Sequence, residues 1–360
     1  MKAVVLAGGY GTRLRPLTET VPKPLLPVAG VPCIDYVLRS LASAGFREII
    51  VATSYMSDRV MKRIGDGLDY DASVLYSFEA VPAGTAGAVK ILEDFVDDTF
   101  VVASGDVLAD VNLTKLHEGH VQRGALATMA LTRAEETSQF GVVEVDAEGR
   151  IVRFQEKPPP GEAFSDLINA GIYVLEPDIL RHVPERKTFD FARDLFPLLL
   201  EGGEALYGTE LEGLWMDIGR PEDLWRASLE VIQRTGKAAR LKGIRSSGKV
   251  LLSDEARIRE GAEIEGPSYI GRGVTLSEGC RVRRSCVYDG VYLDRDVALD
   301  DSVVMEESHI GWQSRIRGSV VATRCRVDED VEIIDSVIGD EMHVRAHTRL
   351  EGASLAPPAE

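Results

Sequence analysis

The segment LAGGYGTRLRPLTETVPKPLLPV, residues 6–28, combines three glycines, several cationic side chains and prolines directly after an apolar stretch. Glycines without a Cβ atom allow backbone N–H groups to come close to an anion. Arg13 can donate two parallel hydrogen bonds to phosphate oxygens, and Lys23, held between two prolines, supplies a point charge. The residue types and their spacing predict a loop that binds polyphosphate.

Two common phosphate-binding loops do not fit this segment. A P-loop requires GxxxxGK followed by Ser or Thr, and the region contains no such sequence. A dinucleotide fingerprint requires GxGxxG, but Leu14 occupies the third glycine position. The acidic residue expected at the end of the second strand is also missing from residues 51–53. These differences argue against a nucleotide-dependent dehydrogenase.

The elements around this loop alternate between short β-rich stretches and helical stretches up to about residue 234. That alternation predicts a doubly wound, Rossmann-like α/β domain, whose ligands bind at the carboxyl ends of the strands. The expected strands are residues 4–7, 49–52, 74–76, 100–104, 125–132, 141–145, 151–155 and 168–175. The expected helices are residues 35–44, 58–65, 88–95, 113–123 and 222–234.

Two aspartates follow apolar stretches of this domain. Asp106 comes after residues 100–104 and a glycine, and Asp217 comes after residues 214–216. Carboxylates from two distant strands could converge on one Mg²⁺ ion, which prefers oxygen ligands and substrate phosphates. The alternative for each aspartate is a turn or a helix N-cap.

The C-terminal part has a different period. Its aliphatic residues recur mainly every six positions, and from Val287 onward one step of five in each group gives a 17-residue period. Three short strands per turn, each with one inward aliphatic residue, are typical of a parallel β-helix built from hexapeptide repeats, which we expect to be left-handed. A Ser-x-aliphatic triplet recurs in register with the period, at Ser268, Ser285, Ser302, Ser319 and Ser336.

These patterns divide the chain into residues 1–234, a linker at residues 235–249 and a β-helix at residues 250–360. The linker is basic, rich in small residues and free of acidic residues, which favours a solvated connection. Binding of a phosphate or a partner is the alternative for this segment.

The glycine-rich loop resembles the signature of the sugar-1-phosphate nucleotidylyltransferases, GGxGTRLxPLT followed by PKP. The resemblance covers the whole chain and includes a C-terminal β-helix, as in the longer members. Within the family, PKPL, GTAG and WMDIG look most like the mannose-1-phosphate guanylyltransferases. The resemblance returns at GTAG (84–87), GD (105–106), FGV (140–142), EKP (156–158), NAG (169–171) and WMDIG (215–219).

The resemblance implies transfer of a nucleoside monophosphate from an NTP to a sugar 1-phosphate, giving an NDP-sugar and pyrophosphate. GTP and mannose 1-phosphate are the implied pair. Open alternatives are dTTP or UTP with glucose 1-phosphate, GTP with a cyclitol phosphate, and a catalytically silent regulatory homologue. Mg²⁺ is the implied cofactor, with Asp106 and Asp217 as its ligands.

The resemblance also implies roles for individual residues. The implied catalytic residues are Arg13, Lys23, Asp106, Lys157 and Asp217. The implied nucleotide-binding residues are Leu6, Ala7, Gly8, Gly9, Gly11, Thr12, Arg13, Lys23, Gly84, Thr85, Ala86 and Gly105. The implied sugar-phosphate-binding residues are Gly141, Glu156, Lys157, Asn169 and Gly171.

Charge and composition argue against several other classes. A formal net charge of −17 disfavours nucleic acid as a partner. No apolar run approaches the roughly 18 residues of a membrane span, and residues 2–7 are too short for a signal sequence. The lack of such a run predicts that the protein has no membrane partner. The four cysteines show no CxxC spacing, which predicts reduced thiols, no zinc site and a cytoplasmic protein.

The role of the β-helix is open at this stage. An open β-helix end would leave unpaired strand edges, so we expect a homo-oligomer, either a dimer or a tetramer. Some hexapeptide β-helices are acyltransferases that use a histidine base, and His309, His343 and His347 are available. No motif surrounds these histidines, which favours a surface or structural role for them.

Overall fold

The structure, a computed structural model, describes residues 1–79, 81–238 and 244–356. Contacts between α-carbons divide the chain into two compact units. The first contains residues 1–9 and 33–216, and the second contains residues 10–32 and 217–360. The segment that follows Gly9 in the glycine-rich loop therefore belongs to the same compact unit as the C-terminal repeats.

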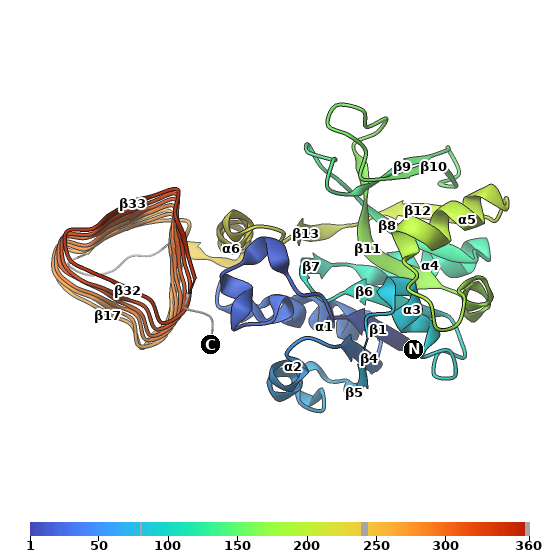
Figure 1. Cartoon of the computed structure of the whole chain (residues 1–360), viewed down its shortest axis with the longest axis horizontal. Coiled ribbons are helices and arrows are strands. Elements are labelled where there is room, and N and C mark those ends of the chain that lie inside the picture. The colour runs from blue at the N-terminus through green and yellow to red at the C-terminus, as the bar shows by residue number, and fades with distance from the viewer. Residues whose placement is uncertain (80, 239–243, 357–360) are drawn as a thin grey trace. The chain divides into compact units, whose positions relative to one another are not determined.

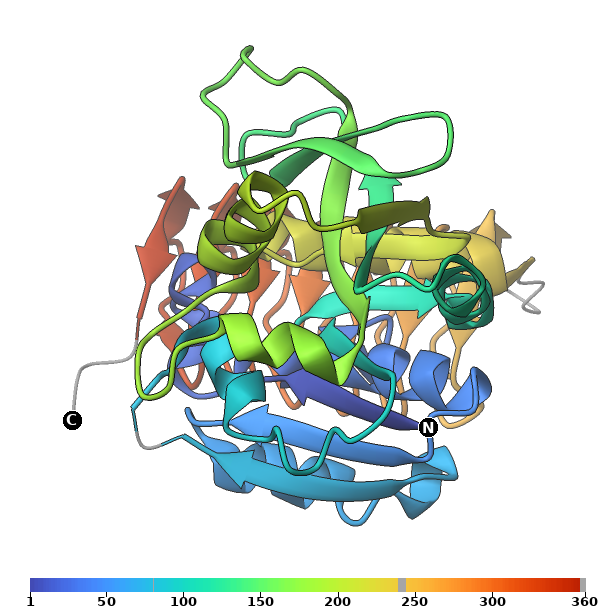
Figure 2. The same ribbon diagram turned by 90° about the vertical axis from the view of Figure 1, so that its right-hand side faces the viewer.

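The first unit is built on a nine-stranded mixed sheet in the order β10-β9-β11-β6-β1-β4-β5, with β8 beside β11 and β12 beside β8. Its central strand β1 (Lys2–Leu6) is parallel to both β4 (Glu48–Thr53) and β6 (Phe100–Ser104). Figure 2 shows β1, β4 and β5 (Ser73–Phe78), the dark to light blue arrows, side by side. The chain winds from β1 to one side and then to the other, which makes this part of the sheet doubly wound, as predicted.

The remaining strands of this unit extend the sheet or form a separate pair. Strand β11 runs antiparallel to β6 and joins the parallel part to β8 and β9. Strands β7 and β13 form a two-stranded sheet of their own. The bounds are β7 (Val107–Val111), β8 (Ala127–Arg133), β9 (Gly141–Val145), β10 (Ile151–Glu156), β11 (Leu167–Leu175), β12 (Leu206–Glu210) and β13 (Gly213–Asp217).

Helices in this unit bury one face each. Helix α1 places Ile34, Val37, Leu38 and Leu41 at helical spacing, and all four are buried. Asn112 caps α4, since its side chain accepts a hydrogen bond from Thr114 N. The helices are α1 (Cys33–Ser43), α2 (Ser57–Ile64), α3 (Gly84–Lys90), α4 (Leu113–Arg123) and α5 (Phe196–Glu201), with 3₁₀ turns at Leu68–Tyr70 and Pro177–His182 and a π-helical turn at Phe191–Leu195.

Most predicted elements are confirmed within a few residues, but one helix is wrong. The structure has strands at residues 100–104 and 141–145 and a helix at residues 113–123, as predicted. The helix predicted at residues 88–95 instead runs from Gly84 to Lys90. It begins early because the Phe189 carbonyl accepts hydrogen bonds from Ala86 N and Gly87 N. It ends early because the chain continues in tight turns, with Leu92 N bonded to Val89 O.

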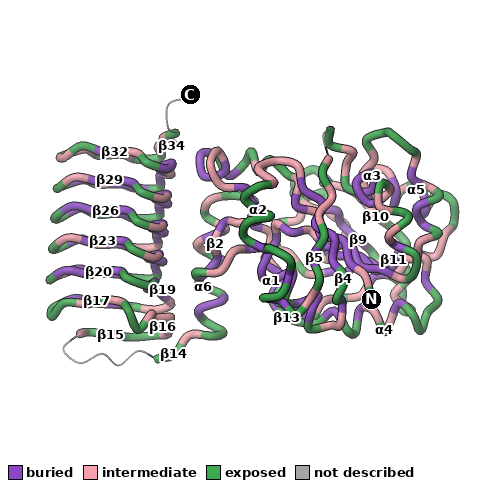
Figure 3. The backbone as a smooth tube through the Cα atoms, turned by 90° about the horizontal axis from the view of Figure 1, so that it is seen from below, coloured by how far each residue is buried: buried purple, intermediate pink, exposed green. Residues whose placement is uncertain are grey.

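The second unit contains a left-handed β-helix made of three parallel sheets, which confirms the interpretation of the repeats. Seen end-on, its coils are triangular (Figure 1). Figure 3 shows the coils stacked, with buried residues on the strands. The predicted inward aliphatic residues from Ile264 to Val344 are buried in one continuous core. Ile258 and Leu350, near the ends of the series, are partly buried and pack against it.

The three sheets have eight, seven and six strands. The first contains β14 (Lys237–Ala238), which is antiparallel to β16, and then β16 (Lys249–Leu252), β19 (Ser268–Ile270), β22 (Cys286–Val287), β25 (Val303–Val304), β28 (Val320–Val321), β31 (Val337–Ile338) and β34 (Ser354–Leu355). The second contains β15 (Arg245–Ser247), β18 (Glu263–Glu265), β21 (Arg281–Arg283), β24 (Ala298–Asp300), β27 (Arg315–Arg317), β30 (Glu332–Ile334) and β33 (Arg349–Glu351). The third contains β17 (Arg257–Ile258), β20 (Thr275–Leu276), β23 (Tyr292–Leu293), β26 (His309–Ile310), β29 (Arg326–Val327) and β32 (His343–Val344).

The second unit also contains the hairpin of β2 (Pro27–Val28) and β3 (Val31–Pro32) and helix α6 (Pro221–Thr235). Of the predicted linker, residues 239–243 lie outside the described residues. Its described ends, β14 and β15, are strands that pair within the β-helix sheets. The predicted boundaries at residues 234 and 249 stay predictions.

Two further observations concern the whole described chain. All four cysteines are free and buried. Across residues 1–79, 81–238 and 244–356, no helix combines the length and the apolar character that crossing a membrane requires.

Candidate active site

Asp106 lies at the carboxyl end of the central parallel strands. Leu6, the last residue of β1, is opposite Ser104, the last residue of β6. The chain then turns at Gly105, whose N–H donates to the Leu6 carbonyl over 2.8 Å. Asp106 follows, half-buried, immediately before β7, and β7 pairs with the strand that ends at Asp217. This is the edge where open α/β sheets bind their ligands.

The first glycines of the loop have different surroundings. The Gly8 carbonyl accepts a hydrogen bond from Ser54 Oγ over 2.9 Å, which fixes the chain after Ala7. A Cβ atom on Gly9 would meet nothing within 4 Å, so this residue faces open space. The open backbone at Gly9 is therefore the part of this segment that an anion could approach.

In the second unit, the structure brings together Arg13, Lys23 and Asp217, which lie far apart in the sequence. Lys23 Nζ is 3.5 Å from Asp217 Oδ1, and its side chain is only 8% exposed. Arg13 Nη2 is 3.7 Å from Asp217 Oδ2, and the arginine side chain is 52% exposed. One carboxylate thus lies between a buried ammonium group and a more exposed guanidinium group.

Short 3₁₀ turns position these side chains. Arg13 lies in the turn Thr12–Leu14, and Lys23 begins the turn Lys23–Leu25, directly after Pro22. A third turn, Leu17–Glu19, contains Thr18, whose hydroxyl donates to the Gly11 carbonyl over 2.8 Å. The hydrogen bond ties the start of the loop to the turns that carry both cations.

The GTAG motif forms the first turn of α3, and its N–H groups already have partners. Thr85 N and Thr85 Oγ1 both donate to Asp190 Oδ1 over 3.1 Å. Ala86 N donates to the Phe189 carbonyl over 2.9 Å. Ala86 is fully buried, whereas Gly84 is half-buried and Thr85 is exposed. Of these three predicted nucleotide contacts, Gly84 and Thr85 are the accessible ones.

Gly141 begins β9, Glu156 ends β10 and Lys157 follows it directly, so the three residues lie at the same end of this strand pair. Gly141 is opposite Glu156 in the strand pair, and a Cβ atom there would lie 2.9 Å from Glu156 Oε2, so a larger residue would displace the Glu156 side chain. Lys157 Nζ is 3.7 Å from Glu156 Oε1. Burial raises the pKa of the Glu156 carboxyl above its ordinary value, and the nearby charges of Lys157 and Arg193 oppose that shift.

Asn169 and Gly171 adjoin each other on β11. Asn169 Oδ1 accepts from Gly171 N, and Asn169 Nδ2 donates to Tyr173 Oη, both over 2.9 Å. These bonds fix the orientation of the amide and leave its second donor and acceptor positions for a ligand. Burial raises the pKa of the Tyr173 hydroxyl, which keeps it a neutral partner for this amide.

Sequence reasoning did not single out Trp215 as a site residue, although it lies in the WMDIG motif. Trp215 Nε1 donates to the Ala170 carbonyl over 2.9 Å, between Asn169 and Gly171. Its ring makes an edge contact with Phe140, the residue before Gly141, at 6.0 Å between centroids. Trp215 therefore links the two groups of predicted sugar-phosphate residues. Its position in the WMDIG motif was the one feature of the sequence that could have indicated Trp215 as a site residue.

No group of three or more His, Cys, Asp or Glu side chains within the described ranges is arranged to hold a metal ion. The donor set proposed for Mg²⁺ is two carboxylates, with the remaining ligands supplied by phosphate and water. Carboxylate oxygens such as those of Asp217 are of the kind that Mg²⁺ prefers, and Arg13 and Lys23 beside Asp217 suit phosphate ligands of that ion. Coordination of one ion by both Asp106 and Asp217 stays a prediction.

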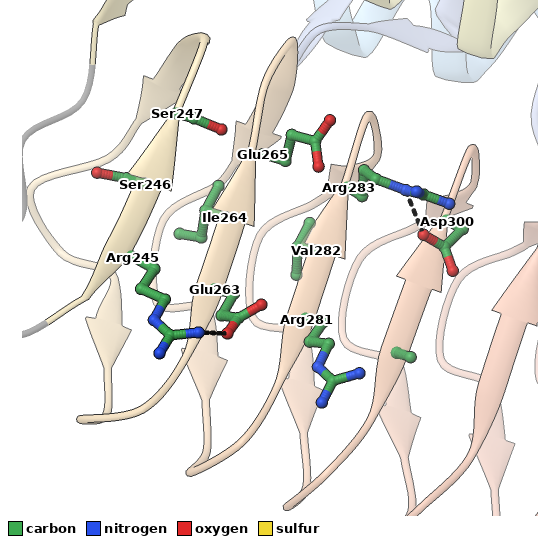
Figure 4. A pocket seen from close by; sticks show the side chains of 11 residues that line it. Arg245, Ser246, Ser247, Glu263, Ile264, Glu265, Arg281, Val282, Arg283 and Asp300 are labelled. Atoms are coloured by element: carbon green, nitrogen blue, oxygen red, sulfur yellow. Dashed lines mark hydrogen bonds and ion pairs between the residues drawn. The ribbon is translucent and has the colours of Figure 1, made fainter.

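The β-helix has a cavity of about 410 Å³ that contains none of the predicted site residues. Arg245 donates to Glu263 over 2.9 Å, and Arg283 donates to Asp300 over 2.7 Å (Figure 4). The remaining charged lining residues are Arg281 and Glu265. Because three arginines and three acidic residues balance, the cavity has no preference for an anion.

The three histidines considered for acyl transfer lie exposed on the β-helix. His343 Nε2 is 2.8 Å from Asp328, and His347 Nδ1 is 2.9 Å from Asp330. The His309 ring makes an edge contact with Tyr292. Each histidine thus has a surface partner of its own.

Comparison with known proteins supports both halves of the chain. Residues 2–234 match the family described as Nucleotidyl transferase, and residues 248–336 match the family described as GlmU-like, C-terminal hexapeptide. The chain is 35% identical over 332 residues to a UTP–glucose-1-phosphate uridylyltransferase from Synechocystis sp., covering 88% of this chain and 86% of that protein. It is 36% identical over 302 residues to a mannose-1-phosphate guanylyltransferase from Mycobacterium tuberculosis, covering 83% and 82%.

A solved structure agrees with the fold. The crystal structure of a proposed glucose-1-phosphate thymidylyltransferase from Bacillus anthracis, in complex with a sucrose, matches with a TM-score of 0.59 at 28% identity. The match covers 67% of this chain and 98% of that chain. Together with the sequence matches, it confirms the resemblance to the sugar-1-phosphate nucleotidylyltransferases, and the chain belongs to the nucleotidyl transferase family, with a C-terminal hexapeptide-repeat β-helix.

Proposed function

We propose that this sugar-1-phosphate nucleotidyltransferase uses GTP and mannose 1-phosphate and releases pyrophosphate. The observation that carries the reaction is the grouping of Arg13, Lys23 and Asp217 beside the glycine-rich loop. The substrate pair is supported by the likeness to the guanylyltransferase from M. tuberculosis. The similar identity to the Synechocystis uridylyltransferase supports UTP and glucose 1-phosphate as the alternative pair.

The reaction needs electrostatic stabilisation more than proton transfer. A phosphate oxygen of the sugar 1-phosphate attacks the α-phosphorus of the nucleotide in line, and the bond to the pyrophosphate oxygen breaks. The nucleophile is already an anion, so no general base is required. The barrier comes from bringing two polyanions together and from the charge that shifts to the leaving group.

Arg13 and Lys23 neutralise the triphosphate and the leaving pyrophosphate. Both cations lie beside the Asp217 carboxylate, with Arg13 Nη2 at 3.7 Å and Lys23 Nζ at 3.5 Å, which holds their charges together where the phosphates would bind. Asp106 and Asp217 are the residues that would hold Mg²⁺, and the ion would withdraw charge from the phosphates as a Lewis acid. Gly9, whose backbone faces open space, is the proposed loop contact for the nucleotide phosphates, and the neighbouring Leu6, Ala7, Gly8, Gly11 and Thr12 hold it in place.

The sugar side uses residues of β9, β10 and β11. Lys157 holds the phosphate of the sugar 1-phosphate, and the Glu156 carboxylate accepts hydrogen bonds from sugar hydroxyls. Asn169, fixed by Gly171 and Tyr173, donates and accepts at the same ring. At the nucleotide base, Gly84 and Thr85 remain the proposed contacts because they are accessible.

The test is pyrophosphate release with Mg²⁺ across GTP, UTP, dTTP, ATP and CTP, each against several hexose 1-phosphates. We expect the strongest signal with GTP and mannose 1-phosphate and its loss with EDTA. A stronger signal with another pair would replace the substrates and keep the mechanism. Binding of a nucleotide sugar without turnover would favour the regulatory homologue. The chain nevertheless contains all the charged residues that the resemblance implies for catalysis, namely Arg13, Lys23, Asp106, Lys157 and Asp217.

Two broader proposals accompany this function. We propose a homo-oligomer, a dimer or a tetramer, because an uncovered β-helix end exposes strand edges. We also propose a cytoplasmic location, since the substrates are nucleoside triphosphates and sugar phosphates. The oligomeric state can be measured by light scattering on the purified full chain.

A further inference from the structure

The β2–β3 hairpin follows the turn that carries Lys23. Lys23–Leu25 is a 3₁₀ turn, and Pro27 begins the hairpin two residues after it. The two hairpin strands are antiparallel, and the turn between them consists of Ala29 (φ 48°) and Gly30 (φ 85°). Whatever fixes this hairpin therefore also fixes the backbone that leads back to Lys23.

Two tyrosines of the β-helix fix the hairpin. Tyr288, which is 2% exposed, donates its hydroxyl hydrogen to the Pro27 carbonyl over 2.9 Å. The Tyr269 ring lies so close to Gly30 that a Cβ atom there would be 2.3 Å from Tyr269 Oη. The two tyrosine rings are in contact, with centroids 5.2 Å apart. The hairpin thus packs on two adjacent coils of the β-helix.

Helix α6 is tied to the same region. Ala29 N, in the hairpin turn, donates to Ser228 Oγ over 3.0 Å. Ser228 Oγ in turn donates to the Leu224 carbonyl within α6 over 2.7 Å. Trp225 Nε1 donates to the Arg284 carbonyl of the β-helix over 2.6 Å.

The two ends of the Lys23–Asp217 ion pair are therefore each connected to the β-helix. The hairpin leads back to Lys23, and α6 begins at Pro221, shortly after Asp217. Both segments contact coils that include Tyr269, Arg284 and Tyr288. The separation of the ammonium group from the carboxylate thus depends on where these coils hold the two segments.

The β-helix side of this contact is shielded from solvent. Ser228 and Cys286 are fully buried and Tyr288 is 2% exposed, and burial raises the pKa of the Cys286 thiol to about 12. Pro27 itself is half-buried. Removal of the Tyr288 hydroxyl deletes the hydrogen bond that holds the Pro27 carbonyl against the β-helix, which frees the hairpin to shift.

We propose that Tyr288 is a positioning residue for nucleotidyl transfer, through which the β-helix holds the hairpin and keeps Lys23 at Asp217. The inference rests on the proposed function, which gives Lys23 its role on the triphosphate. Electrostatic catalysis depends on cations that are fixed before the charge develops, and small displacements are costly in rate. The β-helix is in this sense part of the catalytic apparatus.

The experiment compares Tyr288→Phe with wild type as full chains, using pyrophosphate release. Phenylalanine keeps the buried ring and removes only the hydroxyl. We expect kcat to fall about tenfold, while KM for the sugar 1-phosphate stays within about twofold, since the proposed sugar contacts belong to the other compact unit. Ser319→Ala is the matched control, because it removes a buried β-helix hydrogen bond that does not involve the hairpin.

A double-mutant cycle separates positioning from general weakening. If Tyr288 acts through Lys23, adding Tyr288→Phe to Lys23→Ala should reduce kcat by less than about twofold further. If Tyr288→Phe fails to fold, Trp225→Phe removes the second connection to the β-helix and should give the same loss in kcat with unchanged KM.

Three further results would overturn the inference, and they show whether the proposed function fails with it. A kcat of Tyr288→Phe within twofold of wild type would overturn the inference and leave the proposed function intact. The inference would also be overturned if Tyr288→Phe reduced kcat by the same factor in wild type and in Lys23→Ala, because Tyr288 would then act independently of Lys23. If wild type releases no pyrophosphate with any substrate pair, the proposed function fails and the inference fails with it.

Discussion

The sheet of the first unit and the β-helix bring residues together in different ways. In the sheet, Lys2 on β1 is opposite both Glu48 and Phe100, so neighbouring strands come from distant segments. In the β-helix, Val303 is opposite Val320, one 17-residue coil further on, and the same relation repeats along the stack. The sheet brings distant segments of the chain together in one unrepeated arrangement. The β-helix repeats the same arrangement of neighbouring segments from coil to coil.

The difference determines where chemistry can reside. Each strand end of the sheet carries its own side chains, such as Asp106 after β6 and Lys157 after β10. The coils of the β-helix repeat the same inward aliphatic residues and buried serines, which serve packing and hydrogen bonding. A repeated surface can still take part in catalysis where a unique residue such as Tyr288 contacts the β2–β3 hairpin of the same unit.

The comparison of the sheet with the β-helix predicts that the largest loss of activity follows substitution of a residue at a strand end of the sheet. Asp106→Asn should reduce kcat about 10³-fold, because the variant loses the charge of a proposed Mg²⁺ ligand. The variant should remain folded, since asparagine matches aspartate in size and the side chain is only half-buried.

Asp110→Asn is the matched control for this variant, because Asp110 is exposed on the adjoining strand β7. It should retain wild-type turnover. A folded Asp106→Asn protein with near-wild-type pyrophosphate release would remove Asp106 from the mechanism.

A core substitution in the β-helix should show the opposite pattern. Leu299 is fully buried between coils, so Leu299→Ala should lower the free energy of unfolding by about 2–4 kcal/mol. Turnover per folded molecule should stay within about twofold, because Leu299 lies in the β-helix core on β24, in a different sheet from Tyr269 on β19. Chemical denaturation followed by activity measurements on the folded fraction would check both expectations. A large loss of kcat in the folded protein would show that the two regions are coupled through the whole β-helix core.

The buried serines of the β-helix predict a smaller change in stability. Ser319 Oγ donates to the Arg317 carbonyl over 2.7 Å and accepts from Ser336 N, one coil further on, over 3.0 Å. Ser319→Ala leaves both groups without this partner, which should cost about 1–2 kcal/mol of unfolding free energy.

Ser253→Ala offers the control for Ser319→Ala. Among the residues that the structure describes, the Ser253 hydroxyl accepts one long, local hydrogen bond, from Glu255 N at 3.3 Å. Its replacement should change the unfolding free energy by less than about 0.5 kcal/mol. Equal losses in the two variants would mean that the connections between coils add no stability of their own.

The sequence was most informative where contacts are local or periodic. The six-residue spacing predicted the β-helix core residues because each coil repeats the same environment. The start of α3 at Gly84 could not be predicted, since it depends on the Phe189 carbonyl from a distant segment. The contact of Tyr288 with Pro27 was equally inaccessible, because nothing in the spacing of either segment indicates the other. Motif matching indicated Arg13, Lys23 and Asp217 separately, and the structure supplied their distances.

The smallest expected effect concerns pH at Glu156. Burial raises the pKa of this carboxyl, so on acidification it becomes protonated earlier than an ordinary glutamate would. The protonated form loses its charge and an acceptor for sugar hydroxyls, and KM for the sugar 1-phosphate should therefore rise as pH falls from 7.5 to 5. The phosphate of the substrate, which titrates near pH 6, makes a second contribution to KM, and Glu156→Gln, which cannot titrate at this side chain, retains only that one. We expect the rise in KM to be about threefold larger for wild type than for Glu156→Gln. Parallel KM profiles for the two proteins would mean that the Glu156 carboxylate does not contact the sugar, and that only Lys157 on this strand pair contributes to binding.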